Sequence, residues 1–488
     1  MTVNERTRLL QGHNNAITLS RDEDPKAWST GAKWTVAIIV SSYGLIIPST
    51  AAMVVPAFPQ IARDLSIRDD DVHLVMSIFV LGWGIGPILV APLSEVYGRR
   101  LLLNCGHALF LLTNTLCGLA STKSHFLLLR FLSGLFGSGP MSIGAGVLSD
   151  LWHKEQRGLS LSIYALGPLA GPAIGPIAAG YIVEALSWRY IFFSASAFAA
   201  AMLVLGHFFL RETFGPVLLR WKRRQQQREP GCKYDDDDDD DKGKTLASIR
   251  GDLKRPFIML GTQPIVQTVA LLMGFLFGLN QLTIATFEAV WEQRYGMPPR
   301  TASLNYLAIA AGLILGSQVG GRVNDKIYAL CTRRSSRRHS GSSASTDAGR
   351  PEHRAYLMYA VALLLPTGQL LYSWSAQLHL HFLLPDAGAL VFSAGIIVGY
   401  QCVQAYVIDC YPVYAASAMG ALTLLRSLAG FAMPAVGGRL YAAWGYGWAG
   451  TLVAGVAAAF GVVAPTVLLV WGEGLRARSR FAAGEGGL

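Results

Sequence analysis

Residues 91–100 read Ala91-Pro-Leu-Ser-Glu-Val-Tyr-Gly-Arg-Arg100 and separate two strongly apolar runs, at 72–92 and 101–121. Each run is about 20 residues long, the length of helix that crosses the ~30 Å hydrocarbon core of a bilayer. Gly98 permits the backbone angles of a tight turn, and the paired arginines hold such a turn on one side of a membrane. The stretch therefore predicts two membrane helices joined by a short polar turn.

Apolar runs of this kind recur along all 488 residues, of which 52% are hydrophobic and 15% are charged. Soluble domains carry about 25% charged residues, so the composition indicates a lipid environment. We predict an all-α membrane protein with twelve transmembrane helices. The predicted spans are 34–55, 72–92, 101–121, 126–148, 159–183, 188–209, 262–290, 304–324, 355–374, 380–408, 416–438 and 448–471.

A long polar segment divides these spans into two groups of six, which predicts two pseudo-symmetric six-helix bundles. The segment contains the unbroken acidic run Asp235–Asp241. Such a run repels itself, so we predict a solvated linker, with a cation or partner site as the alternative. The predicted organisation is a cytoplasmic tail at 1–33, a bundle at 34–210, a cytoplasmic linker at 211–261, a bundle at 262–472 and a cytoplasmic tail at 473–488.

The basic residues are distributed unevenly between the two sides of the predicted membrane. The net charge is +10, with 41 Lys and Arg residues. With the N-terminus inside, roughly 32 of the 41 are cytoplasmic, about seven are outside, and Arg130 and Arg426 lie within spans. The positive-inside rule explains this pattern, so we predict cytoplasmic termini and no nucleic-acid partner. The N-terminus is polar up to Trp28, which argues against a cleaved signal peptide.

Patterns for catalysis and for metal binding are missing from the sequence. The six cysteines form no CxxC pair and no metal-ligand spacing, and no disulfide framework is predicted. No nucleophile–base arrangement, phosphate-binding loop or ATP-binding domain is apparent. We therefore predict that the chain is not an enzyme and uses no cofactor or metal.

Two further motifs lie within predicted spans. Arg130-Phe-Leu-Ser-Gly-Leu-Phe-Gly-Ser-Gly139 places an arginine inside the fourth span, where a buried charge is costly and usually functional. An arginine that reaches back to the membrane surface is the alternative. Gly167-Pro-Leu-Ala-Gly-Pro-Ala-Ile-Gly-Pro176 kinks the fifth span at its prolines. Its glycines form a smooth face. Either another helix moves across this face during transport, or the face serves only for close helix packing.

The three motifs resemble, in order, the signature motifs of the major facilitator superfamily, the last of which is typical of its antiporters. The form Ser94-Glu-Val-Tyr-Gly-Arg-Arg100 is similar to that of the fungal twelve-helix drug:proton antiporters, including their polyamine and cycloheximide-resistance branch. Segments such as Arg211–Leu219 extend the resemblance to about residues 24–480. The sequence departs from the motif at Ala91, where glycine is usual, and at Glu95, where aspartate is usual.

The resemblance implies a monomeric transporter that exports small organic molecules in exchange for protons across the plasma membrane, with the vacuolar membrane as an alternative. A polyamine or nutrient transporter and a non-transporting sensor are the competing interpretations. Because Gly321-Arg-Val-Asn-Asp325 lacks the Gly-Arg-Arg ending, a gate is expected only in the first half. Glu95 is expected to pair with Arg99 there, with the positive end of a neighbouring helix as the alternative. The implied gate residues are Glu95, Gly98, Arg99, Arg100, Asp150 and Arg157, and the implied antiporter helix carries Gly167, Pro168, Gly171, Pro172, Gly175 and Pro176.

Proton coupling and substrate binding require polar side chains inside the bundle. The candidates for proton coupling are Arg130, His107, Glu288 and Arg426, whereas Glu184 and Asp386 are more simply membrane-surface residues. Aromatic surface gives contact area and amides fix orientation, so a cavity for amphipathic molecules is predicted, with helix–helix hydrogen bonding as the alternative. Its sparse charge argues against a strongly anionic substrate. The predicted lining is Tyr43, Tyr164, Asn280, Gln281, Tyr400, Gln401 and Gln404.

Overall fold

The computed structural model describes residues 20, 23–68, 71–152, 156–227, 251, 253–338, 351–411, 414–477, 479 and 481. These residues form helices and turns, with no strand among them. The elements are η1 (Pro25–Ala27), α2 (Thr30–Ala52), α3 (Phe58–Asp64), α4 (Leu74–Tyr97), α5 (Arg99–Leu119), α6 (Lys123–Phe136), α7 (Gly139–Leu151), α8 (Arg157–Ala185), α9 (Arg189–Phe209), α10 (Gly215–Gln227), α12 (Pro264–Ala289), η3 (Val290–Arg294), α13 (Pro299–Leu304), α14 (Tyr306–Arg338), η4 (Pro351–Leu357), α15 (Met358–Gln377), α16 (Leu383–Cys410) and α17 (Ala415–Ala477).

Eleven helical segments in the described part of the chain are long and apolar enough to cross a membrane. The last of them, α17, has 63 residues, which at 1.5 Å per residue is about 95 Å and too long for one crossing. Its backbone leaves the helical conformation at Gly445, with φ of 70° and ψ of 172°. Two helices therefore meet there, and the spans number twelve, as predicted.

The fourth span differs from the single helix predicted at 126–148. It consists of α6 and α7, separated at Gly137 and Ser138. Pro140 lies at the start of α7, and proline has no N–H to donate to the preceding turn. The helix therefore ends and restarts in the middle of the bundle.

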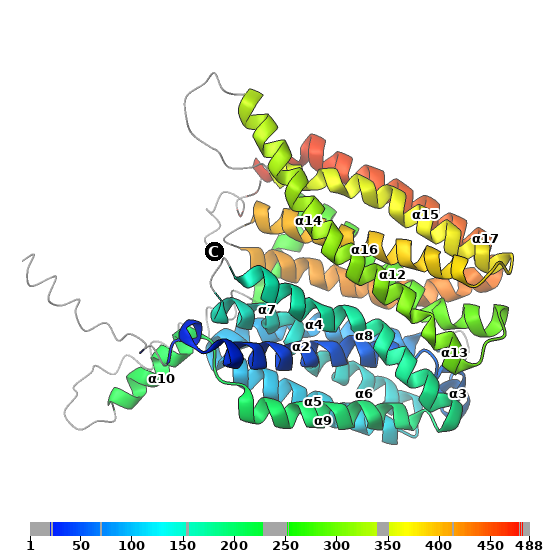
Figure 1. The fold of residues 1–488 in the computed structure, drawn as a ribbon, viewed down its shortest axis with the longest axis horizontal. Coiled ribbons are helices and arrows are strands. Elements are labelled where there is room, and N and C mark those ends of the chain that lie inside the picture. The colour runs from blue at the N-terminus through cyan, green and yellow to red at the C-terminus, as the bar shows by residue number, and fades with distance from the viewer. Residues whose placement is uncertain are drawn as a thin grey trace, which may run out of the picture.

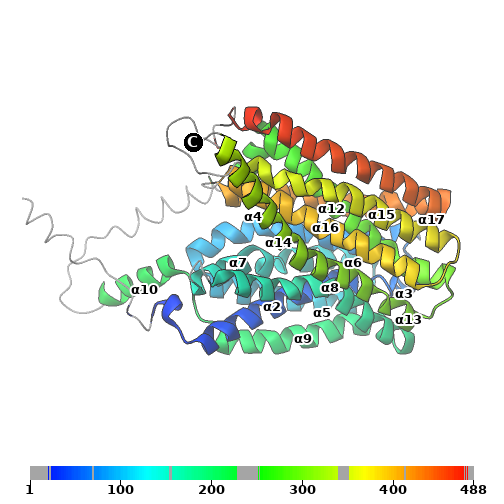
Figure 2. The same ribbon diagram turned by 45° about the horizontal axis from the view of Figure 1, so that its top comes forward.

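Figure 1 shows the helices of the first six spans, drawn in blue to green, lying together beside those of the last six. The same grouping appears when the molecule is turned (Figure 2). Helix α10 lies at one end of the bundle, and α3 and α13 lie at the other. We call these the linker end and the far end.

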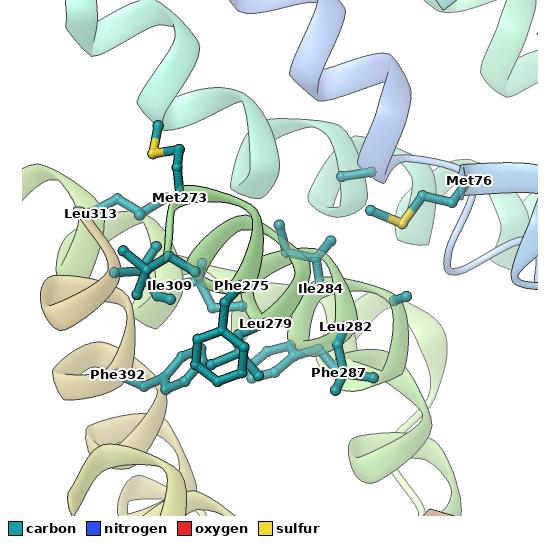
Figure 3. Packing of buried hydrophobic residues seen from close by; sticks show 14 of the residues in the cluster. Met76, Met273, Phe275, Leu279, Leu282, Ile284, Phe287, Ile309, Leu313 and Phe392 are labelled. Carbon is teal, nitrogen blue, oxygen red and sulfur yellow. The ribbon is translucent and has the colours of Figure 1, made fainter. Parts of the chain in front are cut away.

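Helix α12 occupies the centre of the second group, and nearly every residue from Ile265 to Glu288 is buried. Figure 3 shows its side chains Phe275, Leu279 and Phe287 near Phe392 of α16. A helix that is apolar on all faces is stable only when it is surrounded, which explains its central place. Phe277 and Glu288 are both buried residues of α12.

Small residues bring the two groups into contact. A side chain at Gly84 of α4 would collide with Ser427 of α17, and one at Gly180 of α8 would collide with Ser303 of α13. Gly180 lies near the far end, and Gly84 lies in the middle of α4. The two groups are therefore in tight contact from the centre of the bundle to its far end.

Candidate functional site

The turn at the linker end is built around Gly98, which has a φ of 94° and separates α4 from α5. A side chain at this glycine would collide with the carboxylate of Glu212. That carboxylate accepts hydrogen bonds from the backbone N–H groups of Arg99, at 3.0 Å, and Arg100, at 3.1 Å. A negative group at the first turn complements the positive end of the helix dipole. Glu212, from the segment after α9, thus fixes the start of α5.

Arg99 also joins this turn to the end of α7. Its Nε lies 2.5 Å from Oδ2 of Asp150, which also accepts a 3.3 Å hydrogen bond from the Thr213 hydroxyl. The expectation of an arginine opposite Glu95 is therefore not met by Arg99, whose acidic partner is Asp150. Glu95 itself is exposed on α4. The side chain of Arg157 lies outside the described residues.

The second half carries a matching ion-pair cluster, which sequence reasoning missed. Arg354 of η4 contacts Asp325 of α14 at 2.8 Å and Asp409 of α16 at 3.0 Å. Arg476 contacts Glu352 at 3.0 Å close by. The arginine comes from the segment before α15 and not from the residues directly after Asp325. A search for Gly-Arg-Arg after α14 therefore could not find it.

Arg130 is completely buried on α6 and holds three helices together. Its Nε donates to the Val75 carbonyl of α4 at 3.2 Å, and Nη1 donates to the Thr50 carbonyl of α2 at 3.3 Å. Its guanidinium carbon lies 4.4 Å from the centre of the Phe79 ring, which adds a cation–π contact. The burial and these bonds leave no room for the arginine to reach the membrane surface.

His107 and Tyr43 pack together inside the first half. Their rings are stacked at 3.9 Å, and Nε2 of the histidine lies 3.2 Å from the Ala199 carbonyl oxygen. The Tyr43 hydroxyl donates to Asn104 at 3.1 Å, and the Tyr164 hydroxyl donates to the Pro140 carbonyl at 2.7 Å. These side chains therefore have partners inside the first half, in agreement with the helix–helix alternative.

The Gly-Pro helix α8 packs its glycine face on α2. A side chain at Gly167 would collide with the Ser41 backbone, and one at Gly175 would collide with the Ser49 backbone. Gly171 lies between them, against Pro48 and Leu45. The glycines therefore permit close packing within the first half. Pro168, Pro172 and Pro176 all lie inside the same continuous helix.

Glu288 is an acid without a partner in the far part of the second half. It is 3% exposed, and both carboxylate oxygens are buried without a hydrogen-bond partner among the described residues. Its neighbours Tyr306 and Glu292 interact with it electrostatically. A π-helical turn, Val290–Arg294, follows directly, and such turns are frequent at functional sites.

An aromatic cluster lies at the centre of the bundle, where the two halves meet. Trp83 of α4 lies 6.3 Å from Phe277 of α12, and Phe277 lies 6.3 Å from Tyr400 of α16, centre to centre. The guanidinium carbon of Arg426, on α17, is 4.7 Å from the Phe277 ring centre and 5.9 Å from that of Trp83. Of the predicted cavity residues, only Tyr400 belongs to this group, which we call the central cluster.

The four predicted amide residues of the cavity lie in the second half. Gln401 donates from Nε2 to Ser317 on α14, which ties α16 to α14. Gln281 is buried in α12, whereas Asn280 and Gln404 are half-buried. Trp83 and Phe277 were missed. The segment Gly82-Trp-Gly-Ile-Gly86 was the available signal for Trp83, since glycines on both sides of a tryptophan let neighbouring helices approach it closely.

Residues 40–434 match the family described as the Major Facilitator Superfamily. The chain belongs to this superfamily. It is 48% identical to the MFS-type transporter oryF of Aspergillus oryzae, over 98% of each chain. It is 38% identical to the efflux pump vrtL of Penicillium aethiopicum, over 95% of this chain and 90% of the relative. These relatives indicate a transporter.

The fold of this transporter is that of its superfamily. A structure of the xylose transporter XylE from E. coli, in a partially occluded inward-open conformation, covers 89% of this chain and 98% of its own, with a TM-score of 0.62 and 14% identity. A second structure, of the proton:xylose symporter XylE bound to 6-bromo-6-deoxy-D-glucose, has a TM-score of 0.63 and 14% identity. It covers 90% of this chain and 96% of its own. The predicted all-α fold of two six-helix bundles is confirmed. The protein is a multi-pass membrane transporter.

Proposed function

We propose that this transporter is a proton-coupled exporter of small organic molecules, which acts as a monomer in the plasma membrane and works by alternating access. Two of its fungal relatives are named efflux pumps, vrtL at 38% identity and radE of Floropilus chiversii at 31%. We assign it to the fungal drug:proton antiporters, in the branch that includes polyamine and cycloheximide-resistance proteins. The motif at residues 91–100 supports this assignment.

The proposal is supported above all by the central cluster. It combines Trp83 from the first half with Phe277 and Tyr400 from the second. A molecule held between the two halves would lose contacts when they rock apart, which is what alternating access requires. Aromatic walls suit amphipathic organic molecules, because they offer large contact areas at a low cost in side-chain entropy.

Glu288 is our candidate for the proton site. A carboxylate buried without a partner costs several kcal/mol when ionised, so its charge depends on whether water reaches it. Phe277 and Glu288 are 11 residues apart on α12, or about 16 Å along its axis. Proton and substrate would therefore occupy different positions on one helix, and a shift of that helix would connect them.

We propose that the gate residues at the linker end act through ion pairs that brace each half. Arg99–Asp150 and Arg354–Asp409 each join two segments of the same half. The contact of Gly180 with Ser303 joins the two halves at the far end. We propose that this contact belongs to the state closed at the far end. The ion pairs would keep each half rigid while the halves move.

Growth of yeast lacking its own drug exporters tests the function. Cells expressing the transporter, tagged with a fluorescent protein to locate it, are exposed to a broad panel of organic compounds. We expect increased tolerance to at least one compound and fluorescence at the plasma membrane. The Glu288→Gln variant should reach the membrane and lose that tolerance. Unchanged tolerance across the panel, with the protein at the membrane, would contradict export.

A further inference from the structure

Arg426 differs from the other arginines inside the bundle because no acid or carbonyl oxygen in the described part of the chain accepts a hydrogen bond from it. Arg99 and Arg354 have carboxylate partners, and Arg130 donates to two carbonyl oxygens. The Nε of Arg426 is buried without a partner among the described residues. An uncompensated charge inside a membrane is costly, so such residues usually serve a ligand.

The surroundings of Arg426 also contain other unused binding capacity. Tyr400 interacts with it electrostatically, and the buried Tyr400 hydroxyl has no hydrogen-bond partner in the described part of the chain. Arg426 and Tyr400 are half-buried, whereas Trp83 is 8% exposed and Phe277 is 5% exposed. The Tyr400 hydroxyl and Arg426 Nε are themselves buried, so these two polar atoms lie inside the bundle without an acceptor or donor among the described residues.

Among the described residues, Tyr400 is the titratable group that interacts electrostatically with Arg426, and no carboxylate is recorded beside it. A cationic molecule placed there would meet the positive charge of Arg426 without a compensating carboxylate in the cluster. An anion would instead receive the guanidinium and the hydroxyl as donors. Guanidinium groups bind planar carboxylates and similar oxyanions through paired hydrogen bonds.

We propose that the central cluster binds flat aromatic or conjugated molecules that carry an acidic group, with the anion on Arg426 and Tyr400 and the ring against Trp83 and Phe277. This proposal rests on the proposed function and names the substrate class of its transport site. It replaces the expectation, drawn from the sequence, that the substrate is not strongly anionic. The expectation from the sequence was based on the small number of charges predicted in the cavity. Whether Arg426 has a hydrogen-bond partner can be seen only in the folded protein.

The test measures binding, so that it does not depend on transport. The full chain in lipid nanodiscs is titrated by calorimetry with 2-naphthalenesulfonate, an anion at all working pH values, and with the uncharged 2-naphthalenesulfonamide. We expect the wild-type protein to bind the sulfonate at least tenfold more tightly. Arg426→Gln should bind both compounds equally, and Arg426→Lys should keep part of the preference because it keeps the charge.

Arg439→Gln is the matched control, since it makes the same chemical change on an exposed side chain of the same helix. It should retain the full preference for the sulfonate. Thermal unfolding of each variant confirms that it is folded. If Arg426→Gln does not fold, the preference for the sulfonate is measured in Arg426→Lys and Tyr400→Phe, where we expect it to be reduced. Equal binding of both compounds by the wild type, or no binding of either, would overturn the proposal. So would an unchanged preference in folded Arg426→Gln.

The proposed function and this inference can fail separately. A preference for the sulfonate that depends on Arg426 would support the anion site even if the Glu288→Gln variant showed no defect in export. Export that depends on Glu288, together with equal binding of the sulfonate and the sulfonamide, would remove only the anion site.

Discussion

Arg354 and Asp409 form a 3.0 Å ion pair that repeats, in the second half of the molecule, the 2.5 Å pair of Arg99 with Asp150. In each half the arginine lies at or just before the start of the third span, and the acid lies at the end of the fourth. The two halves therefore share side-chain chemistry at the linker end, although their local sequences differ. Both pairs are at least two-thirds buried, so they are more than surface ion pairs.

Breaking the first pair should reduce both stability and transport. Asp150→Asn leaves the partly buried Arg99 without its counter-charge, which costs about 1–3 kcal/mol. We expect a lower unfolding temperature and a transport rate that falls several-fold. The exchanged pair Arg99→Asp with Asp150→Arg should recover part of the loss. If Asp150→Asn transports at the wild-type rate, the pair has no part in the cycle.

The pair in the second half should behave in the same way. Asp409→Asn leaves Arg354 with Asp325 as its remaining ion-pair partner, so we expect a smaller loss of stability than in Asp150→Asn. Comparing the unfolding temperatures and transport rates of the two variants checks this order. A larger loss in Asp409→Asn would show that the two clusters are not equivalent.

Gly98→Ala should destabilise the turn between α4 and α5. The φ of 94° with ψ of 156° strains any residue with a side chain, by roughly 1–3 kcal/mol, and the new methyl group would displace Glu212 from α5. Gly158→Ala is the control, because a methyl group at that helical position meets no atom within 4 Å. Thermal unfolding should show a clear loss for Gly98→Ala and little change or a gain for Gly158→Ala. Equal unfolding temperatures would contradict the account of the turn.

The spans could be predicted from the sequence because a membrane demands about 20 apolar residues for each crossing. The central cluster could not be predicted, because it combines α4 with α12, α16 and α17. Trp83 and Arg426 are 343 positions apart in the chain, and their contact depends on how the two halves pack. Arg99 and Asp150 were both predicted as gate residues, but Arg99 was expected to pair with Glu95, since its contact with Asp150 is formed only in the folded protein.

A disulfide across the far end should stop the cycle. A Cβ added at Gly180 lies 2.9 Å from Cβ of Ser303 and 2.7 Å from the Pro299 carbonyl oxygen, so Gly180→Cys with Ser303→Cys should crosslink once α8 and α13 move slightly apart. In a background with Cys105, Cys232 and Cys331 replaced by serine, oxidation should abolish transport and reduction should restore it. Gly180→Cys alone is the control. Full transport by the crosslinked protein would show that these segments do not separate.

Proton exchange in proteoliposomes tests the central claim most directly. A pH-sensitive dye is enclosed, and the compound identified in the yeast panel is added outside. The account predicts that wild-type protein moves protons against the compound, that Glu288→Gln moves the compound without protons, and that the exposed control Glu184→Gln behaves as wild type. Compound movement without any proton movement by the wild type, or unchanged proton movement in Glu288→Gln, would contradict it.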